Sequence, residues 1–236
     1  MNQPPLVDPL LAGLPRPEAL LFDLDGTLVD TVQLRIAGWQ EALRRSGIEL
    51  DREFIAAHIG ADGRWLAREM GRAVGRDMDW AESDEIDRLS GSLFDEMNSA
   101  PQTLPGAREL LTALERSGFP FAIATASQPG QVAVSVAALR LPSQPQITDA
   151  GHVEHAKPAP DLLLAAAAQL GVAPEMCWYV GDSTWDMMAA VRAGMIGVGV
   201  ETGVAGAESL LGAGANVVLD GLPALQEDLR RRGLLG

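Results

Sequence analysis

The sequence predicts an α/β fold: a doubly wound, Rossmann-like parallel sheet with an inserted all-α helical domain. Three observations predict it, namely short apolar runs that stop at small or polar residues, helical segments between these runs, and one long stretch with helical patterns only. Strands buried on both faces are apolar throughout, and their alternation with helices is typical of parallel sheets.

Five apolar runs are expected to form the strands of the sheet. Each run is too short for a helix and is followed by a small or polar residue. The runs are 19–22, 121–124, 177–180, 196–200 and 217–219.

Helices are expected between these strands and over one long insertion after the first strand. The helices expected between strands are 105–117, 158–170 and 184–193, and the last two stop before a glycine. From residue 33 to residue 100 the sequence has helical patterns and no strand signal. We therefore expect a helical domain over 33–100, inserted into an α/β core made of 1–32 and 101–236.

Charge and composition argue against several classes of partner. The chain has 32 acidic and 18 basic side chains, a net charge of −14, which disfavours binding to nucleic acids or anionic membranes. No apolar run reaches the ~18 residues of a membrane span. Residues 1–14 contain three prolines and no basic residue, which makes a poor signal peptide. Cys177 is the only cysteine, so we expect no internal disulfide and a cytoplasmic protein.

Polar side chains follow three of the expected strands, and they suit the chemistry of phosphate esters. Asp23 and Asp25 end the first strand, Thr125 ends the second and Asp182 follows the third. Ligands of open α/β sheets bind at the carboxyl ends of the strands, so these side chains should meet. One carboxylate can attack phosphorus while another acts first as acid and then as base. Two carboxylates beside a phosphate require cations, and Mg²⁺ prefers carboxylate ligands.

Lys157 is a candidate for a second cation at this site. It is the only lysine in a chain with 17 arginines, and it precedes the helix expected before the third strand. Its ammonium would act as a compact charge on a phosphoryl group. Asp186 lies four residues after Asp182 and could orient Lys157 or a bound water, while Asp182 also suits the N-cap of the helix 184–193.

Four segments together resemble the motifs of the haloacid dehalogenase-like hydrolase superfamily. They agree with its motifs in order and spacing, from Leu20 to the end of the chain, and Thr31 stands where serine is common. The four segments are 22–31 (FDLDGTLVDT), Thr125, Lys157-Pro158 and 181–186 (GDSTWD). The helical insertion resembles the cap domain of the branch that contains phosphoglycolate phosphatases and β-phosphoglucomutases.

The resemblance implies a Mg²⁺-dependent phosphatase acting on a small phosphorylated metabolite, as a monomer or small homo-oligomer. It implies an aspartyl-phosphate intermediate on Asp23, with Asp25 protonating the leaving alcohol and later activating water. The implied metal ligands are the Asp23 side chain, the Asp25 main-chain carbonyl and Asp182. The implied phosphoryl-binding residues are Thr125, Ala126 and Lys157, with Asp186 behind them.

Other candidates are less specific. Arg64 lies in a segment that resembles the substrate-facing loop of helical caps, where it would suit an anionic substrate group, and it suits a solvated helix surface equally well. His152 and His155 lie just before Lys157 without a third ligand nearby, so we interpret them as loop histidines.

Three alternative functions are open at this point. A β-phosphoglucomutase-like enzyme is disfavoured by Thr27, where those mutases often carry valine, and by Arg35, where they have a cap-hinge histidine. A haloacid dehalogenase would need neither a metal nor an acid such as Asp25. A non-catalytic binding module would not need the intact pair Asp23 and Asp25.

Overall fold

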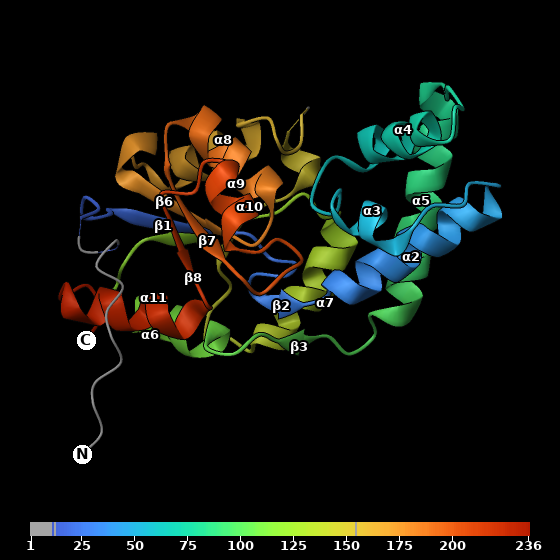
Figure 1. Cartoon of the computed structure of the whole chain (residues 1–236). Coiled ribbons are helices and arrows are strands. Elements are labelled where there is room, and N and C mark those ends of the chain that lie inside the picture. The colour runs from blue at the N-terminus through green and yellow to red at the C-terminus, as the bar shows by residue number, and fades with distance from the viewer. Residues whose placement is uncertain (1–10, 12, 154) are drawn as a thin grey trace, which may run out of the picture.

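The fold is described from a computed structural model, which covers residue 11 and residues 13–153 and 155–236 (Figure 1). Most of residues 1–14, which we expect to make a poor signal peptide, therefore lies outside the described residues.

Six parallel strands form the central sheet, in the order β5-β4-β1-β6-β7-β8. Their bounds are Ala19–Phe22 (β1), Phe121–Ala124 (β4), Gln146–Thr148 (β5), Cys177–Gly181 (β6), Ile196–Val200 (β7) and Val217–Leu219 (β8). All five expected strands form. The sixth, β5, was not expected because Ile147 is the one apolar residue in its Gln-Ile-Thr sequence.

Helices cover both faces of the sheet, as a doubly wound fold requires (Figure 1). One face packs against α6 (Ala107–Arg116), α7 (Pro129–Leu139) and α11 (Leu222–Arg231). The other packs against α8 (Asp161–Leu170), α9 (Thr184–Ala193) and α10 (Ala207–Gly212). Along β1 the side chains alternate between these layers: Leu20 and Phe22 face the first and Leu21 faces the second. Two short 3-10 helices, Ala150–His152 and Pro174–Met176, lie in connecting loops.

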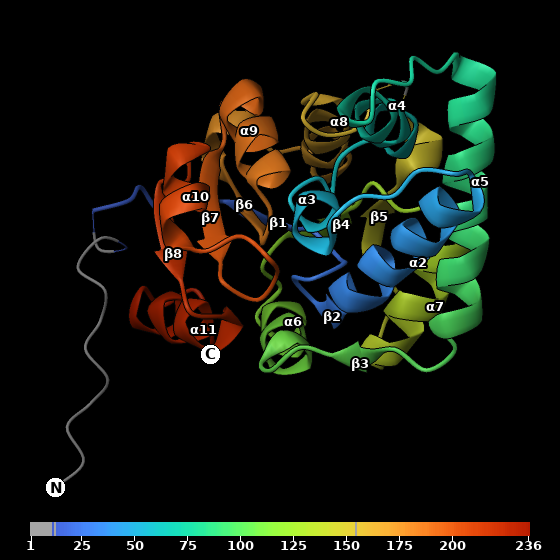
Figure 2. The same ribbon diagram turned by 45° about the vertical axis from the view of Figure 1, so that its right-hand side comes forward.

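Four further helices pack around an apolar cluster of their own and lie beside the sheet. They are α2 (Val32–Arg45), α3 (Arg52–Ala56), α4 (Gly63–Ala73) and α5 (Trp80–Met97), and they are called the cap below. Figure 2 shows α2 and α5 side by side. A two-stranded antiparallel ribbon of β2 (Val29–Asp30) and β3 (Gln102–Thr103) joins the start of this insertion to its end. The helical insertion is therefore confirmed, while the domain limits at residues 33 and 100 stay predictions.

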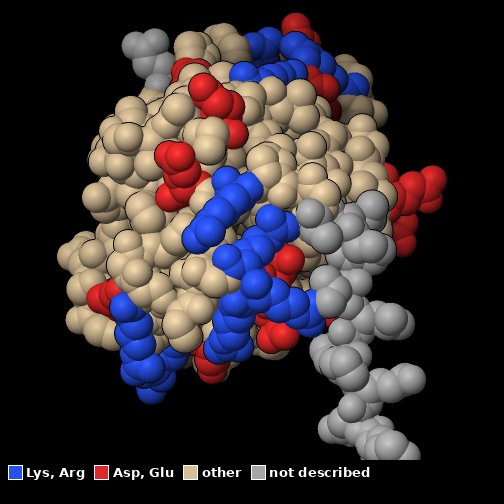
Figure 3. All heavy atoms as spheres, turned by 90° about the vertical axis from the view of Figure 1, so that its left-hand side faces the viewer, with Lys and Arg blue, Asp and Glu red and all other residues tan. Residues whose placement is uncertain are grey.

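Arginines are prominent on the face that lies away from the cap. Figure 3 shows Arg side chains gathered there beside acidic ones, within a largely uncharged surface. One arginine of the chain, Arg232, makes contacts that stabilise the fold. Arg232, which follows α11, donates to Asp228 Oδ2 at 2.6 Å and to the Leu14 carbonyl at 3.1 Å. Its guanidinium lies 5.1 Å from the centre of the Trp178 ring.

Within the described part of the chain, no helix combines the length and apolar character that crossing a membrane requires.

Candidate functional site

One cavity of about 740 Å³ lies between the strand ends of the core and the cap. It is lined by every residue that we expected to react or to bind substrate: Asp23, Asp25, Arg64, Thr125, Ala126, Lys157 and Asp182. Asp186, expected to act behind them, is buried and does not line the cavity. Four separate segments of the core therefore meet at one place, as the parallel sheet predicts, and Arg64 joins them from the cap.

Lys157 lies in the most buried part of the site. Its Nζ is 2.6 Å from Asp23 Oδ1 and 2.7 Å from Asp186 Oδ1, and only 1% of its surface is exposed. Burial by itself lowers the pKa of a lysine, but the charges of Asp186 and Asp23 outweigh it and raise the pKa of Lys157. The ammonium therefore stays charged, positioned beside the carboxylate proposed to react.

Three buried carboxylates surround this ammonium. Oxygen atoms of Asp23, Asp182 and Asp186 all lie within 4.8 Å of one another. Burial and the charge of Asp186 raise the pKa of Asp23 to about 7 against the opposing effect of Lys157. Burial and the charges of Asp186 and Asp23 raise the pKa of Asp182 well above its ordinary value. When all three groups are ionised, three carboxylates and one ammonium leave an excess of negative charge. This repulsion contributes to the raised pKa values, and a divalent cation would offset it.

The surroundings of Asp182 also fit a metal site. Thr27 Oγ1 donates to Asp182 Oδ1 at 2.8 Å, which fixes the orientation of the carboxylate. A Cβ atom at Gly26 or Gly203 would collide with this carboxylate, so the backbone approaches it on two sides. Gly26 has a φ of +85°, a left-handed conformation that favours glycine. Hard carboxylate oxygens in a buried cluster are the donors that Mg²⁺ prefers.

Asp25 points away from this cluster and towards the cap. It accepts hydrogen bonds from Thr31 Oγ1 at 2.6 Å, from Arg35 at 3.0 Å and from the Ser127 hydroxyl. Burial by itself raises the pKa of Asp25, but the charge of Arg35 and these hydrogen bonds hold it below its ordinary value. Asp25 is therefore held as an ionised carboxylate in this arrangement.

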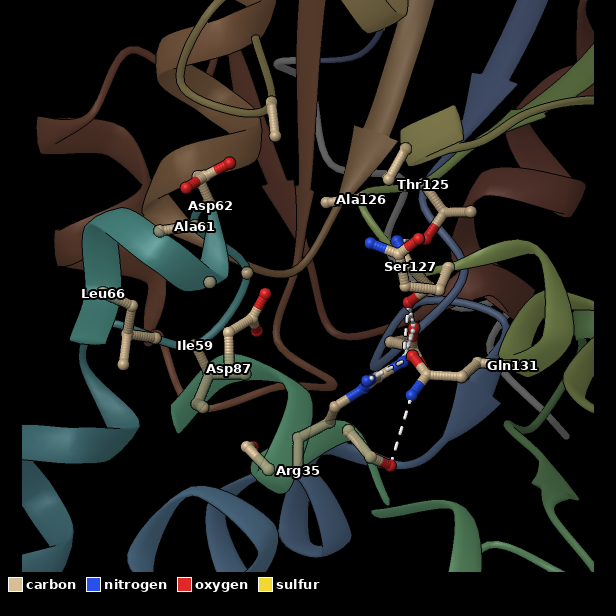
Figure 4. A pocket seen from close by; sticks show the side chains of 18 of the residues that line it. Arg35, Ile59, Ala61, Asp62, Leu66, Asp87, Thr125, Ala126, Ser127 and Gln131 are labelled. Carbon is tan, nitrogen blue, oxygen red and sulfur yellow. Dashed lines mark hydrogen bonds and ion pairs between the residues drawn. The ribbon is translucent and has the colours of Figure 1, made fainter. Parts of the chain in front are cut away.

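Arg35 connects the cap to the strand ends (Figure 4). Besides Asp25, this α2 side chain donates to Ser127 Oγ at 2.6 Å and to Gln131 Oε1 at 2.8 Å, both in the core. Its guanidinium also lies 3.6 Å from the centre of the Phe94 ring of α5. Sequence patterns assign Arg35 no role in the site, because only tertiary structure brings α2, α5 and the end of β4 together.

Asp186 and Tyr179, which do not line the cavity, hold Lys157 in position by hydrogen bonds to its Nζ. The Tyr179 hydroxyl donates to Asp186 Oδ1 at 2.9 Å, and Asp186 Oδ2 accepts from the Ser183 backbone N–H at 3.0 Å. The sequence patterns above do not indicate a role for Tyr179. The signal available for it is that the only tyrosine of the chain lies inside a buried apolar strand. The idea that Asp182 caps the following helix is wrong: Ser183 is the N-cap of α9 and forms a capping box with Asp186.

Two weaker sequence candidates have local partners. Arg64 lines the cavity with 47% of its side chain exposed, 3.9 Å from an Asp62 oxygen and 3.7 Å from an Asp84 oxygen. His152 pairs with Asp149 in the capping box of a 3-10 helix, and His155 lies 3.0 Å from Asp161. Neither histidine belongs to a metal-ligating cluster within the described residues.

Comparison with known proteins agrees with this geometry. Residues 20–200 match the family model described as haloacid dehalogenase-like hydrolase. The chain is 31% identical over 206 residues to "Probable phosphatase IndB" of Dickeya dadantii, covering 85% of this chain and 88% of that protein. It is 29% identical over 179 residues to "Hexitol phosphatase A" of Escherichia coli, covering 76% of this chain and 81% of that protein.

The solved structures give the same result. The crystal structure of a hydrolase from Pseudomonas syringae superimposes with a TM-score of 0.86 at 32% sequence identity, covering 91% of this chain and 98% of that one. The family match spans both the strand ends that line the cavity and the whole cap. The chain belongs to the haloacid dehalogenase-like hydrolase family.

Proposed function

We propose that this protein is a metal-dependent phosphatase that hydrolyses a small phosphomonoester through an aspartyl-phosphate intermediate on Asp23. One observation carries the proposal: the buried ammonium of Lys157 lies 2.6 Å from an Asp23 oxygen at the bottom of a cavity that Asp25 also lines. The phosphatase names of the relatives support the same class of reaction.

In the first step, a carboxylate oxygen of Asp23 attacks the phosphorus atom, and the bond between phosphorus and the ester oxygen breaks. Asp25 enters this step in its protonated form, gives the proton to the departing alcohol oxygen and is left as the ionised carboxylate. The proton is the one that Asp25 takes from water in the second step of the preceding turnover. Lys157 and Thr125 bind the phosphoryl oxygens, so their charge and hydrogen bonds stabilise the negative charge of the transition state.

In the second step, Asp25 takes a proton from a water molecule whose oxygen attacks the phosphorus of the aspartyl phosphate. The bond between phosphorus and the Asp23 oxygen breaks, which releases inorganic phosphate and restores the carboxylate. Asp25 acts here as a base, and the ionised form held by Arg35 and Ser127 is the form that accepts a proton.

Asp23, Asp182 and the main-chain carbonyl of Asp25 are the residues that we propose as ligands of Mg²⁺. When bound, the ion supplies electrostatic stabilisation of the charge on the transferring phosphoryl group. The excess of carboxylates over cations in the buried cluster supports this assignment. Asp186 supports Lys157 from behind instead of acting as a ligand, because its Oδ1 already accepts from Lys157 and Tyr179.

Activity should depend steeply on the metal. With para-nitrophenyl phosphate as substrate, we expect EDTA to abolish phosphate release and added Mg²⁺ to restore it, because the chain has a net charge of −14 and cannot attract phosphate by its overall field. The measurement is the rate of phosphate release with and without each addition. Dechlorination of a halo-acid that survives EDTA would instead identify a haloacid dehalogenase and overturn the phosphatase proposal.

A further inference from the structure

Asp87 is a cavity residue that the mechanism does not use. It lies on α5, and Figure 4 shows its side chain pointing into the cavity, with Asp62 and Arg35 on either side. A Cβ atom at position 63 would collide with its carboxylate, so the glycine at the start of α4 leaves room for this group. Asp87 therefore lines the cavity from the cap, while Asp23 lines it from the strand ends of the core.

Among the residues that the structure describes, the carboxylate of Asp87 has no hydrogen-bond or ion-pair partner. In the described part of the chain, no backbone or side-chain donor forms a hydrogen bond with it, and no cation lies within ion-pair distance. Asp25 provides the contrast, because three side chains of the protein donate to that cavity carboxylate. A cavity carboxylate without an internal donor is available to accept a hydrogen bond from a ligand.

The charged residues around Asp87 leave this wall acidic. Arg64 is shared between Asp62 and Asp84, and the charge of Arg35 is paired with Asp25. With Arg35 set aside as part of that ion pair, carboxylates outnumber guanidinium groups on the cap side of the cavity. The carboxylates are Asp62, Asp84, Asp87 and Asp95, and the guanidinium groups are Arg64 and Arg88. A second negative charge on a substrate would therefore be repelled here.

We propose that Asp87 is a specificity-determining residue, which accepts a hydrogen bond from a hydroxyl group of the leaving alcohol and rejects phosphomonoesters that carry a second anionic group. The substrate class is then a phosphorylated sugar or polyol with a neutral leaving group. This inference rests on the proposed phosphatase function and names the class of substrate that the same site selects.

The raised pKa of Asp87 in the protein without substrate supports this role. Burial and the charge of Asp62 raise the pKa of Asp87 to about 6, with Asp84 contributing and with Arg35 and Arg64 opposing. Because the pKa is raised, the folded state becomes less stable as the pH rises from the ordinary aspartate value through about 6. A carboxylate that destabilises the fold at neutral pH and faces the cavity is typical of a group kept for binding.

Matched substrate pairs test the inference. Each pair has the same carbon number and differs in a terminal hydroxymethyl or carboxylate group: 2-hydroxyethyl phosphate with phosphoglycolate, glycerol 3-phosphate with 3-phosphoglycerate, and sorbitol 6-phosphate with 6-phosphogluconate. The pair to be compared is the one whose members are turned over with the highest kcat/KM. Within it, we expect kcat/KM for the alcohol to exceed that for the acid about ten-fold or more, because a hydrogen bond to a charged group changes affinity by about this factor.

The variant Asp87→Asn removes the charge and keeps the shape of the side chain. We expect it to lower kcat/KM for the preferred alcohol about ten-fold, mainly through KM, and to bring the ratio within the pair close to one. The loss of turnover for para-nitrophenyl phosphate, which has no aliphatic hydroxyl group, should be clearly smaller than the loss for the preferred alcohol. Glu85→Gln is the matched control, because Glu85 is exposed on the same helix and does not line the cavity.

Two further measurements test the inference even if Asp87→Asn has little activity. The Tm of Asp87→Asn should exceed that of the wild type by about 2–4 °C near pH 8, and this gain should shrink as the pH falls from about 6 towards 4. In the wild type, the preference for the alcohol over the acid should narrow over the same fall in pH, because Asp87 becomes neutral.

The outcomes separate the two proposals. Asp23-dependent hydrolysis of para-nitrophenyl phosphate combined with a preference for the carboxylate substrates overturns the role of Asp87 and leaves the phosphatase proposal intact. If the ratio of kcat/KM for the alcohol to that for the acid is the same in Asp87→Asn as in the wild type, the role of Asp87 is likewise overturned and the phosphatase proposal stays intact. Failure of the wild type to hydrolyse any phosphomonoester in the presence of Mg²⁺ overturns both.

Discussion

Replacement of Asp23 by asparagine should lower the rate of phosphate release by about a thousand-fold or more, because the amide cannot act as the attacking carboxylate. The change preserves the size of the side chain. Lys157 also keeps its 2.7 Å contact with Asp186, so the buried cluster is not dismantled. The expected defect is therefore chemical, and it should appear in kcat more than in KM.

This expectation is checked by steady-state hydrolysis of para-nitrophenyl phosphate with saturating Mg²⁺, together with a circular dichroism spectrum of the variant. Asp30→Asn is a suitable control because Asp30 lies seven residues later, is exposed at the end of β2 and does not line the cavity. Turnover like that of the wild type in Asp23→Asn would rule out Asp23 as the nucleophile.

Replacement of Lys157 by methionine should have the largest effect on stability. The substitution leaves Asp23 and Asp186 buried without their cation, and loss of one member of a buried ion pair costs about 3–5 kcal/mol. We also expect phosphate release to fall below detection, because the same ammonium is proposed to bind the phosphoryl group. Urea denaturation without added metal measures the free energy of unfolding.

A double variant distinguishes this electrostatic cause from simple misfit. Lys157→Met combined with Asp186→Asn removes one of the unpaired carboxylates, so it should be more stable than Lys157→Met alone. Arg231→Met, at the partly exposed pair with Glu227, should change stability by less than about 1 kcal/mol. A Lys157→Met protein as stable as the wild type would contradict the charge arrangement described for the site.

The strands and the core of the site were predictable because both follow from local sequence patterns. Parallel strands are apolar along their length, and their carboxyl ends share one edge of the sheet, so Asp23, Thr125 and Asp182 had to meet. The strand β5 could not be predicted in this way, because Gln146 and Thr148 are polar and leave no apolar run. Its place at the edge of the sheet is what tolerates such a composition.

The contacts made from the cap could not be predicted, because they depend on how two separately packed units meet. Arg35 and Gln131 are 96 residues apart, and nothing near either residue indicates their 2.8 Å contact. In the sequence, Asp87 resembles any acidic residue on a helix. Only the structure shows that it lines the cavity and has no hydrogen-bond partner among the described residues. The prediction that Asp182 suits the N-cap of α9 is wrong by one residue. Asp182 and Ser183 are adjacent and both carry side-chain oxygens, and the sequence does not fix the start of a helix to one position.

Covalent phosphorylation of Asp23 is the central claim, and trapping the intermediate tests it most directly. Asp25→Asn removes the base of the second step, while the nitrophenolate of para-nitrophenyl phosphate leaves without an acid, so the aspartyl phosphate should accumulate. The measurement is mass spectrometry of the acid-quenched and digested protein. We predict one added phosphoryl group on the peptide that contains Asp23, and none after Asp23→Asn. Phosphate release by a protein that carries no phosphoryl group, or carries it on another residue, would contradict the mechanism.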